Sequence, residues 1–187
     1  MDVSGHPEPL IITDAAINIA PTLIEKADII RNAIDLAHVI GLAEPRVAIL
    51  SAVETVNPAM PTTLDAAALC KMADRGQITG ALLDGPLAFD NAISEAAARE
   101  KGIVSSVAGK AQILVVPDLE AGNMLAKQLT FLGGADAAGV VLGARVPIIL
   151  TSRADSLRTR LASCAVATLL ARAATNAAPG LPQGSAA

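Results

Sequence analysis

Residues 22–51 read TLIEKADIIRNAIDLAHVIGLAEPRVAILS, and they predict an amphipathic helix followed by a buried strand. Apolar residues recur every three or four positions over 22–40, which is typical of a helix with one face against a core. Thr22 and Glu25 have the spacing of a capping box at the start of that helix. The run 47–51 is apolar up to its last residue, as expected of a strand buried on both faces of a parallel sheet.

The same alternation of short apolar runs and longer amphipathic runs continues along the chain. It predicts strands at 10–13, 47–51, 81–84, 113–116, 138–142 and 146–151, and helices at 22–40, 62–75, 91–101, 119–132 and 155–173. Such alternation indicates an α/β fold, a three-layer αβα sandwich with a mostly parallel sheet. We expect this unit to cover residues 10–173, and the stretch 174–187, rich in Ala, Gly, Pro and Ser, to be a disordered tail.

Composition limits the function classes. Hydrophobic residues make up 52% and aromatic residues 1%, so the core must be built from Leu, Ile, Val and Ala. The formal net charge of −4 argues against a non-specific nucleic-acid partner, which would need a basic face. No window of about 18 residues lacks both charges and turn residues, so we predict no membrane span. The first residues show no export signal, and both cysteines lie in helical patterns, so we expect a cytoplasmic protein without a disulfide.

Ser152 and Arg153 stand between the last predicted strand and the last predicted helix. Backbone N–H groups at such a point can face an anion. An arginine can hold phosphate oxygens in a fork, and a serine hydroxyl can add a hydrogen bond. In the alternative interpretation, Ser152 or Asp155 only caps the helix and Arg153 is solvated. Local sequence leaves both interpretations open.

Polar residues also follow two other predicted strands, where ligands of open α/β sheets bind. Asp84 begins the sequence Asp-Gly-Pro-Leu, typical of a tight turn, and Asn91 follows it closely. Asn123 and Lys127 are four residues apart on one face of a predicted helix, so they can address one ligand. The alternatives are turn chemistry for the first pair and a plain surface pair for the second.

Common cofactor and metal motifs are missing from the sequence. It contains no Gly-x-Gly-x-x-Gly and no complete P-loop pattern, so nicotinamide and nucleotide sites of those kinds have no support. His6 and His38 are not spaced as metal ligands with each other or with the cysteines, and we predict no metal site.

Seven motifs, in order, resemble phosphate acetyl/butyryltransferases, and the similarity covers roughly residues 10 to 172. They are TDAAINI at 13–19, SAVETV at 51–56, MADRGQ at 72–77, DGPLAFDN at 84–91, VAG at 107–109, PDLEAGNM at 117–124 and TSR at 151–153. The chain looks more like the phosphate butyryltransferase branch, including the acyltransferase half that is fused to a hydratase domain in some bacteria.

The resemblance implies reversible acyl transfer from acyl-CoA to phosphate, with CoA and phosphate as substrates and no further cofactor. It implies a homodimer of two-domain αβα subunits related to isocitrate and isopropylmalate dehydrogenases, with the site between domains. Residues 14–145 would form the second domain, and 146–173 the closing strand and helix of the first.

The resemblance also suggests site residues. Ser152 and Arg153 match the family's Ser-Arg pair at the phosphate end, and Asp155 is the carboxylate closest to it. The positions that match the lining of the cleft are Asp84, Asn91, Asn123 and Lys127.

Two alternatives to a working acyltransferase stay open. Family members carry a further α/β segment before the point that corresponds to Asp14, so we expect a truncated gene product or a true start upstream. A non-catalytic fragment that binds CoA or dimerises would then be the alternative function. A nicotinamide-dependent dehydrogenase relative is a third interpretation, but it requires a metal-binding cluster of Asp residues that this spacing does not supply.

Overall fold

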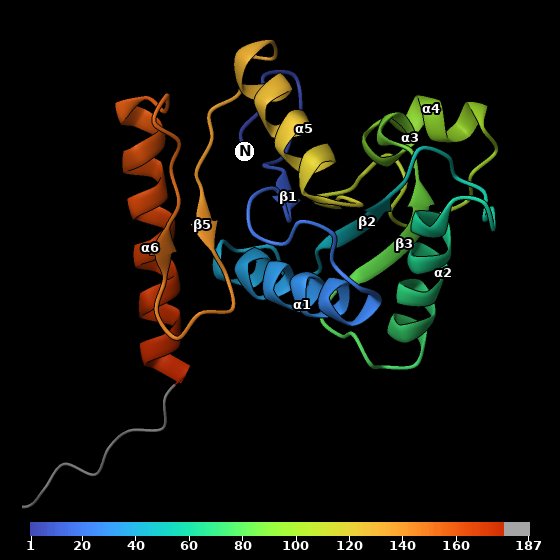
Figure 1. The fold of residues 1–187 in the computed structure, drawn as a ribbon, viewed down its shortest axis with the longest axis horizontal. Coiled ribbons are helices and arrows are strands. Elements are labelled where there is room, and N and C mark those ends of the chain that lie inside the picture. Colours follow the sequence, from blue (N-terminus) through green and yellow to red (C-terminus); the bar gives the residue numbers. More distant parts are fainter. Residues whose placement is uncertain (178–187) are drawn as a thin grey trace, which may run out of the picture.

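A four-stranded parallel sheet forms the centre of the computed structural model, which describes residues 1–177 of the chain (Figure 1). Its strands are β1 (Ile11–Thr13), β2 (Arg46–Leu50), β3 (Leu82–Leu87) and β4 (Ile113–Val115), in the spatial order β1-β4-β2-β3. The predicted α/β class with a mostly parallel sheet is therefore confirmed.

Helices cover both faces of this sheet. The helices α1 (Leu23–Val39) and α2 (Pro61–Asp74) pack on one face, while α3 (Phe89–Ile93), α4 (Glu95–Glu100) and α5 (Leu119–Phe131) lie over the other. Successive side chains of β2 point to opposite faces of the sheet. Val47 and Ile49 pack in the core under α1 and α2, and Ala48 and Leu50 pack in the core on the other face. The three predicted layers are thus confirmed.

The capping box at the start of α1 forms as the sequence predicts. The Thr22 N–H donates to Glu25 Oε2 at 2.7 Å, and the Glu25 N–H donates to Thr22 Oγ1 at 3.4 Å. Ile30 and Ile34 then point into the core and are almost fully buried. Each such side chain contributes about 1.5–3 kcal/mol of burial free energy, so this face fixes α1 on the sheet.

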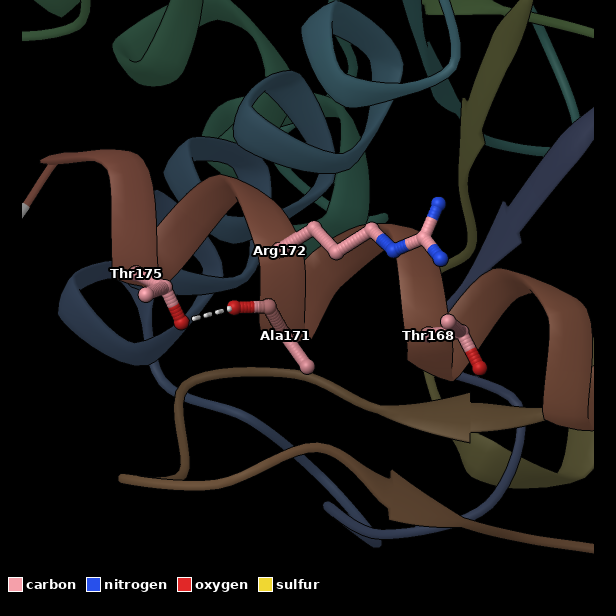
Figure 2. A pocket seen from close by; sticks show the side chains of 4 residues that line it. All are labelled: Thr168, Ala171, Arg172 and Thr175. Atoms are coloured by element: carbon pink, nitrogen blue, oxygen red, sulfur yellow. Dashed lines mark hydrogen bonds between the residues drawn. The ribbon is translucent and has the colours of Figure 1, made fainter.

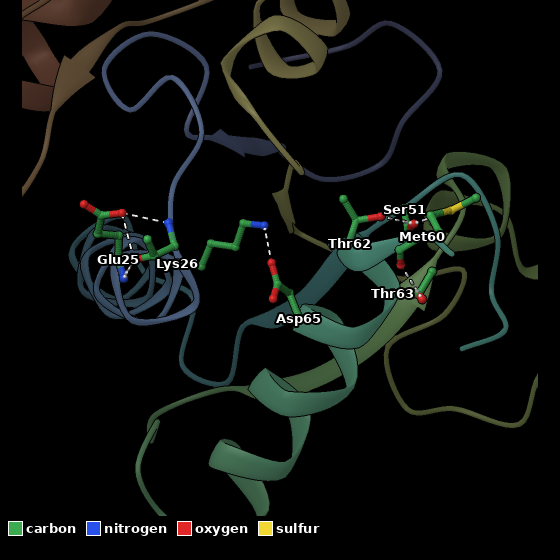
Figure 3. A network of polar contacts seen from close by, with 8 residues as sticks. Glu25, Lys26, Ser51, Met60, Thr62, Thr63 and Asp65 are labelled. Atoms are coloured by element: carbon green, nitrogen blue, oxygen red, sulfur yellow. Dashed lines mark hydrogen bonds and ion pairs between the residues drawn. The ribbon is translucent and has the colours of Figure 1, made fainter. Parts of the chain in front are cut away.

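An ion pair joins α1 to α2 on the same face of the sheet. Lys26 Nζ donates to Asp65 Oδ2 at 2.7 Å, and only 7% of the Lys26 side chain is exposed (Figure 3). A lysine buried to this extent needs a partner for its charge, so Asp65 ties the two helices together.

Strands form within the predicted segments 138–142 and 146–151, but these strands do not join the parallel sheet, and in that respect the prediction is wrong. Instead β5 (Val140–Val141) and β6 (Ile148–Ile149) form an antiparallel pair against α6 (Leu157–Ala177). Gly143, at φ +77°, lies in the loop 142–147 that reverses the chain between these two strands. In Figure 1 this pair and α6 stand beside the main sheet, where α6 contacts α1.

Two further boundaries differ from the predictions. The sequence from Asp84 to Leu87 lies inside β3 and not in a turn. Pro86 fits there because β3 is an edge strand, which can lack an N–H donor on its outer side. The predicted helix 91–101 is split at Ser94, whose Oγ accepts the Ala97 N–H and caps α4.

The prediction of a disordered tail over 174–187 is wrong for residues 174–177, which are helical. Helix α6 runs past residue 173 to Ala177, and residues 178–187 lie outside the described part of the chain.

Asp14 organises the loop that follows β1. Its carboxylate accepts the N–H groups of Ala16, Ile17 and Asn18 at 2.8–2.9 Å and the Asn18 side-chain amide at 2.7 Å. Partial burial acts to raise the pKa of Asp14, but these hydrogen bonds outweigh it and hold the pKa below its ordinary value. The loop is thus stabilised by the ionised carboxylate.

Asp14 should make stability depend on acid pH. A carboxyl group with a lowered pKa in the folded state contributes stability above its ordinary pKa and loses it as pH falls through the lowered value. We expect the difference in unfolding free energy between wild type and Asp14→Asn to shrink from about pH 5 to pH 2, measured by urea unfolding. Parallel profiles for the two proteins would contradict this role.

Candidate active site

A pocket of about 280 Å³ opens at the carboxyl ends of β2 and β4. The segments that line it are Leu50 to Ala52 after β2, Phe89 at the start of α3, Val116 and Pro117 after β4, and Ala121 and Leu125 of α5. β2 and β4 are neighbours, yet the helices that follow them, α2 and α5, lie on opposite faces of the sheet. Ligands of open α/β sheets bind at this kind of topological switch point.

Ser51 supplies the polar side chain in the pocket wall. Its Oγ lies 2.8 Å from Thr62 Oγ1 and 3.4 Å from Met60 Sδ (Figure 3). Met60 and Thr62 flank the first residue of α2, so the start of that helix holds the serine hydroxyl. The hydroxyl is largely buried and already bonded, which leaves the pocket predominantly apolar.

A charged cluster follows the pocket-lining segments in sequence. Glu54 Oε2 accepts from Asn91 Nδ2 and from Lys101 Nζ, both at 3.3 Å. Lys101 also donates to Asp90 at 3.1 Å, and this hydrogen bond lowers the pKa of Asp90 and raises that of Lys101. Asn91 is fully buried, and its Oδ1 has no hydrogen-bond partner within residues 1–177. The buried Asn91 side chain thus holds the Glu54 carboxylate in place through its Nδ2 donor.

The two predicted residues on α5 point away from the pocket. Ala121 and Leu125 face it, and a helix turns by about 200° over two residues, so Asn123 and Lys127 lie on another face. Asn123 Nδ2 donates to the Ala15 carbonyl at 3.3 Å, which ties α5 to the loop after β1. Lys127 is exposed to solvent.

Ser152 and Arg153 lie in an exposed turn before α6, and not at a helix start as predicted. The helix begins at Leu157, where Ser156 Oγ accepts the Thr159 N–H and takes the capping role. Asp155 accepts the Ser152 N–H at 2.6 Å, while Ser152 Oγ accepts the Ala154 N–H at 3.3 Å. The expected buried strand before this turn is also wrong, because Ile148 and Ile149 are 46% and 45% exposed.

Asp84 lies within β3, half-buried, and its carboxylate accepts the Gly85 N–H at 2.8 Å. The nearby Cys70 thiol donates to the Gly85 carbonyl at 3.6 Å. Burial, followed by the negative charges of Asp84 and Asp74, raises the pKa of Cys70 to about 12. This thiol stays protonated at neutral pH and is unsuited to act as a nucleophile.

A second concavity, of about 330 Å³, lies along α6. Figure 2 shows its lining side chains, Thr168, Ala171, Arg172 and Thr175, which all come from this one helix. The Thr175 hydroxyl donates back to the Ala171 carbonyl at 2.9 Å. With a wall on one side only, this is a helix surface and not a built site.

Two features are absent from the described part of the chain, residues 1–177. No helix there is long and apolar enough to cross a membrane. No group of three or more His, Cys, Asp or Glu residues in residues 1–177 is arranged to hold a metal ion.

Comparison with known proteins gives the family. The family model described as phosphate acetyl/butaryl transferase matches residues 3–168. The chain belongs to this family. It is 75% identical over 171 residues to a phosphate acetyltransferase of Rhizobium meliloti, a match covering 91% of this chain and 54% of the relative. It is 51% identical over 162 residues to a phosphate butyryltransferase of Clostridium acetobutylicum, covering 87% and 54%.

A solved structure of a branched-chain phosphotransacylase from Enterococcus faecalis V583 superposes with a TM-score of 0.77 at 40% identity. That match covers 84% of this chain and 56% of the solved one. The chain therefore spans about half the length of its relatives in this transferase family. The expected closer likeness to the butyryltransferase branch is not favoured by these identities, because the phosphate acetyltransferase named above has the higher value.

The predicted site residues of this family member form two separate groups. Asp84, Asn91 and Asn123 belong to the main sheet and its helices, whereas Ser152, Arg153 and Asp155 lie beside the start of α6. In Figure 1 that start stands across the molecule from the carboxyl ends of β2 and β4. Their roles stay predictions, as does the division of the chain between two domains.

Sequence reasoning missed the residues that build the pocket. Phe89 is one of two phenylalanines in the chain, and it stands between the predicted residues Asp84 and Asn91. Leu125 stands between Asn123 and Lys127 in the same way. The missed signal was the apolar residues within these polar motifs.

Proposed function

We propose that the chain catalyses acyl transfer between acyl-CoA and phosphate, giving an acyl phosphate and free CoA. The observation that carries the proposal is the family match over residues 3–168, with relatives of that activity named at 51% and 75% identity. CoA and phosphate serve as substrates, and the reaction needs no further cofactor.

The proposed acyl transfer takes place in two steps, addition of phosphate and loss of CoA. A phosphate oxygen attacks the thioester carbonyl carbon, and the tetrahedral intermediate then expels the CoA thiolate, which takes up a proton from solvent or a side chain. In reverse, a thiol with an ordinary pKa of about 8.5 must first lose its proton. Positive charge and N–H or O–H donors at the phosphate stabilise both directions.

We assign the phosphate end to the turn before α6. Arg153 is exposed and can hold two phosphate oxygens in a fork. Ser152 Oγ lies one residue away and can add a hydrogen bond. Asp155 orders this turn by accepting the Ser152 N–H with one carboxylate oxygen, Oδ2, and its other oxygen can take the proton of the thiol. We assign Asp84, Asn91, Asn123 and Lys127 to the binding and positioning of substrate.

We also propose a homodimer. Support comes from the outer face of α6, where Leu157, Leu161 and Leu169 are 73%, 60% and 43% exposed. Large apolar side chains repeated along one helix face are typical of a surface that another protein surface covers.

Release of CoA tests the proposed activity. The purified chain is incubated with acetyl-, propionyl- or butyryl-CoA and phosphate, and free thiol is followed with a chromogenic disulfide. We expect release that depends on phosphate and on the chain. CoA binding without turnover would instead support the alternative of a non-catalytic fragment that only binds CoA or dimerises.

A further inference from the structure

Within one chain, the two groups of assigned site residues lie too far apart to hold the two reacting groups. Arg153, assigned to the phosphate, lies beside the start of α6, whereas Asp84 and Asn91 lie in β3 and α3 (Figure 1). An attacking atom must come within about 3–3.5 Å of the carbon it attacks. A phosphate at Arg153 therefore cannot reach a thioester held near Asp84 and Asn91 of the same chain.

An apolar ridge runs along the outer side of α6. Its members recur at every fourth residue, which is the spacing of one helix face. They are Leu157, Leu161, Ala165 and Leu169, and all four are exposed. The opposite face of the helix carries Ser163 and Ala167, which are buried against the rest of the chain. The ridge has no partner within residues 1–177, so it is open to another protein surface.

A second apolar group lies on the carboxyl-end face of the main sheet, the face formed by the loops and helix starts that follow its strands. Ile17, Ile19 and Ile24 are 51%, 75% and 64% exposed there, in the loop after β1 and at the start of α1. The Leu119 N–H donates to the Ile19 carbonyl at 3.1 Å, which places Ile19 beside the start of α5 and near the pocket. Acidic side chains stand in the first turns of three helices of this face, Glu25 in α1, Asp90 in α3 and Glu120 in α5.

Net charge indicates which of these surfaces suits the ridge. Residues 138–177 contain five arginines, no lysine and one acidic residue, a net charge of +4. Residues 1–137 contain nine basic and seventeen acidic residues, a net charge of −8. Two ridges from two copies would bring like charges together, which opposes association. The ridge of one copy on the carboxyl-end face of another brings opposite charges together, which favours association.

We propose that, in the homodimer, the ridge and the turn 151–155 of one copy dock on the carboxyl-end face of the second copy, and that this contact completes each active site. Arg153 of one chain then meets the substrate held near Asp84 and Asn91 of the other. Two such contacts related by a two-fold axis close the dimer and complete two sites. The inference rests on the proposed acyl transfer and homodimer, and it names the two surfaces that meet.

Cross-linking tests the contact without requiring turnover. All chains carry Cys164→Ser, and the Cys70 thiol is protonated because burial raises its pKa to about 12. Leu157→Cys is mixed with Ile19→Cys on a chain with a larger tag, and a short bis-maleimide is added. We expect at least about tenfold more mixed product than when Leu132→Cys replaces Ile19→Cys, because contact raises the effective concentration of the two thiols.

Leu132 is the matched control because it is also exposed but follows the far end of α5 from Ile19. That helix has 13 residues and is therefore about 20 Å long. Equal yields with the two partners, or a predominant product between two Leu157→Cys chains, would overturn the proposal.

Mixing two variants tests whether the site is shared. Arg153→Ala removes the cation for phosphate, and Asp84→Asn removes a carboxylate but keeps an acceptor for the Gly85 N–H. We expect each variant alone to lose CoA release from acetyl-CoA and phosphate. After subunit exchange, half of the dimers in an equal mixture contain both variants, and one of their two sites has both native residues. The mixture should thus recover about one quarter of wild-type release.

The outcomes separate this inference from the proposed function. If wild type releases CoA but the mixture is as inactive as its components, each site lies within one chain and the inference fails alone. If the product between Leu157→Cys and Ile19→Cys forms but wild type releases no CoA, the docking stands and the proposed function fails. If neither the product nor CoA release is seen, both fail.

Discussion

Replacing Arg153 by alanine is expected to lower kcat/KM for phosphate-dependent CoA release by about 10²- to 10³-fold, the typical cost of removing one donor to developing negative charge. Arg153 is the cation of the Ser-Arg pair and is free to turn its guanidinium toward solvent-borne phosphate. Arg153→Lys should recover only part of the rate, because an ammonium is a point charge that cannot grip two oxygens as a planar fork does.

Arg160→Ala is the control for charge alone. Arg160 is exposed on the first turns of α6, so its removal changes the net charge near the turn by the same amount. We expect its kcat/KM to stay within about twofold of wild type, since the charge of a solvent-exposed side chain outside the turn is largely screened by salt. Equal losses in both variants, or no loss in Arg153→Ala, would remove Arg153 from the phosphate site.

Replacing Gly109 by alanine is expected to lower the free energy of unfolding by about 2–5 kcal/mol. The residue has φ +80°, a conformation that costs an alanine about 1–2 kcal/mol. A Cβ there would also stand 2.6 Å from the backbone N and Cα of Glu95, at the start of α4, and overpacking of this kind costs about 1–3 kcal/mol more. Urea unfolding measures the change.

Gly102→Ala separates the conformational cost of an alanine at positive φ from the cost of the close contact with α4. Gly102 has a similar φ of +68°, but nothing lies within 4 Å of the position its Cβ would take. We expect only the conformational cost of about 1–2 kcal/mol for this variant. If the two variants lose equal unfolding free energy, the close approach of Gly109 to α4 does not contribute to the loss of stability.

The main sheet could be predicted because its signals are local. The apolar runs that became β1, β2 and β4 are short and continuous, and the capping box of Thr22 and Glu25 marks the start of α1. The last two predicted strands form, as β5 and β6, but they lie outside the parallel sheet, because a short apolar run does not tell which partner strand it will meet. Their partner is each other, across the reversal at Gly143.

The candidate site was predicted only in part. Polar motifs near strand ends predict Asp84, Asn91 and Asn123 as site residues, and this role stays a prediction, but the sequence does not say which way each side chain points. Asn91 turns inward to Glu54, and Asn123 turns to Ala15. The pocket itself depends on tertiary contacts among three distant segments, which no local pattern records.

The spatial order of the strands has a consequence for the chain as it leaves the ribosome. β4, at Ile113–Val115, lies between β1 and β2, although it is synthesised long after both. Until those residues emerge, the facing edges of β1 and β2 have no neighbour and present open backbone groups to other nascent chains. Native pairing at the centre of the sheet must wait for that late insertion, so an incomplete chain exposes its central strand edges until residues 113–115 have been made.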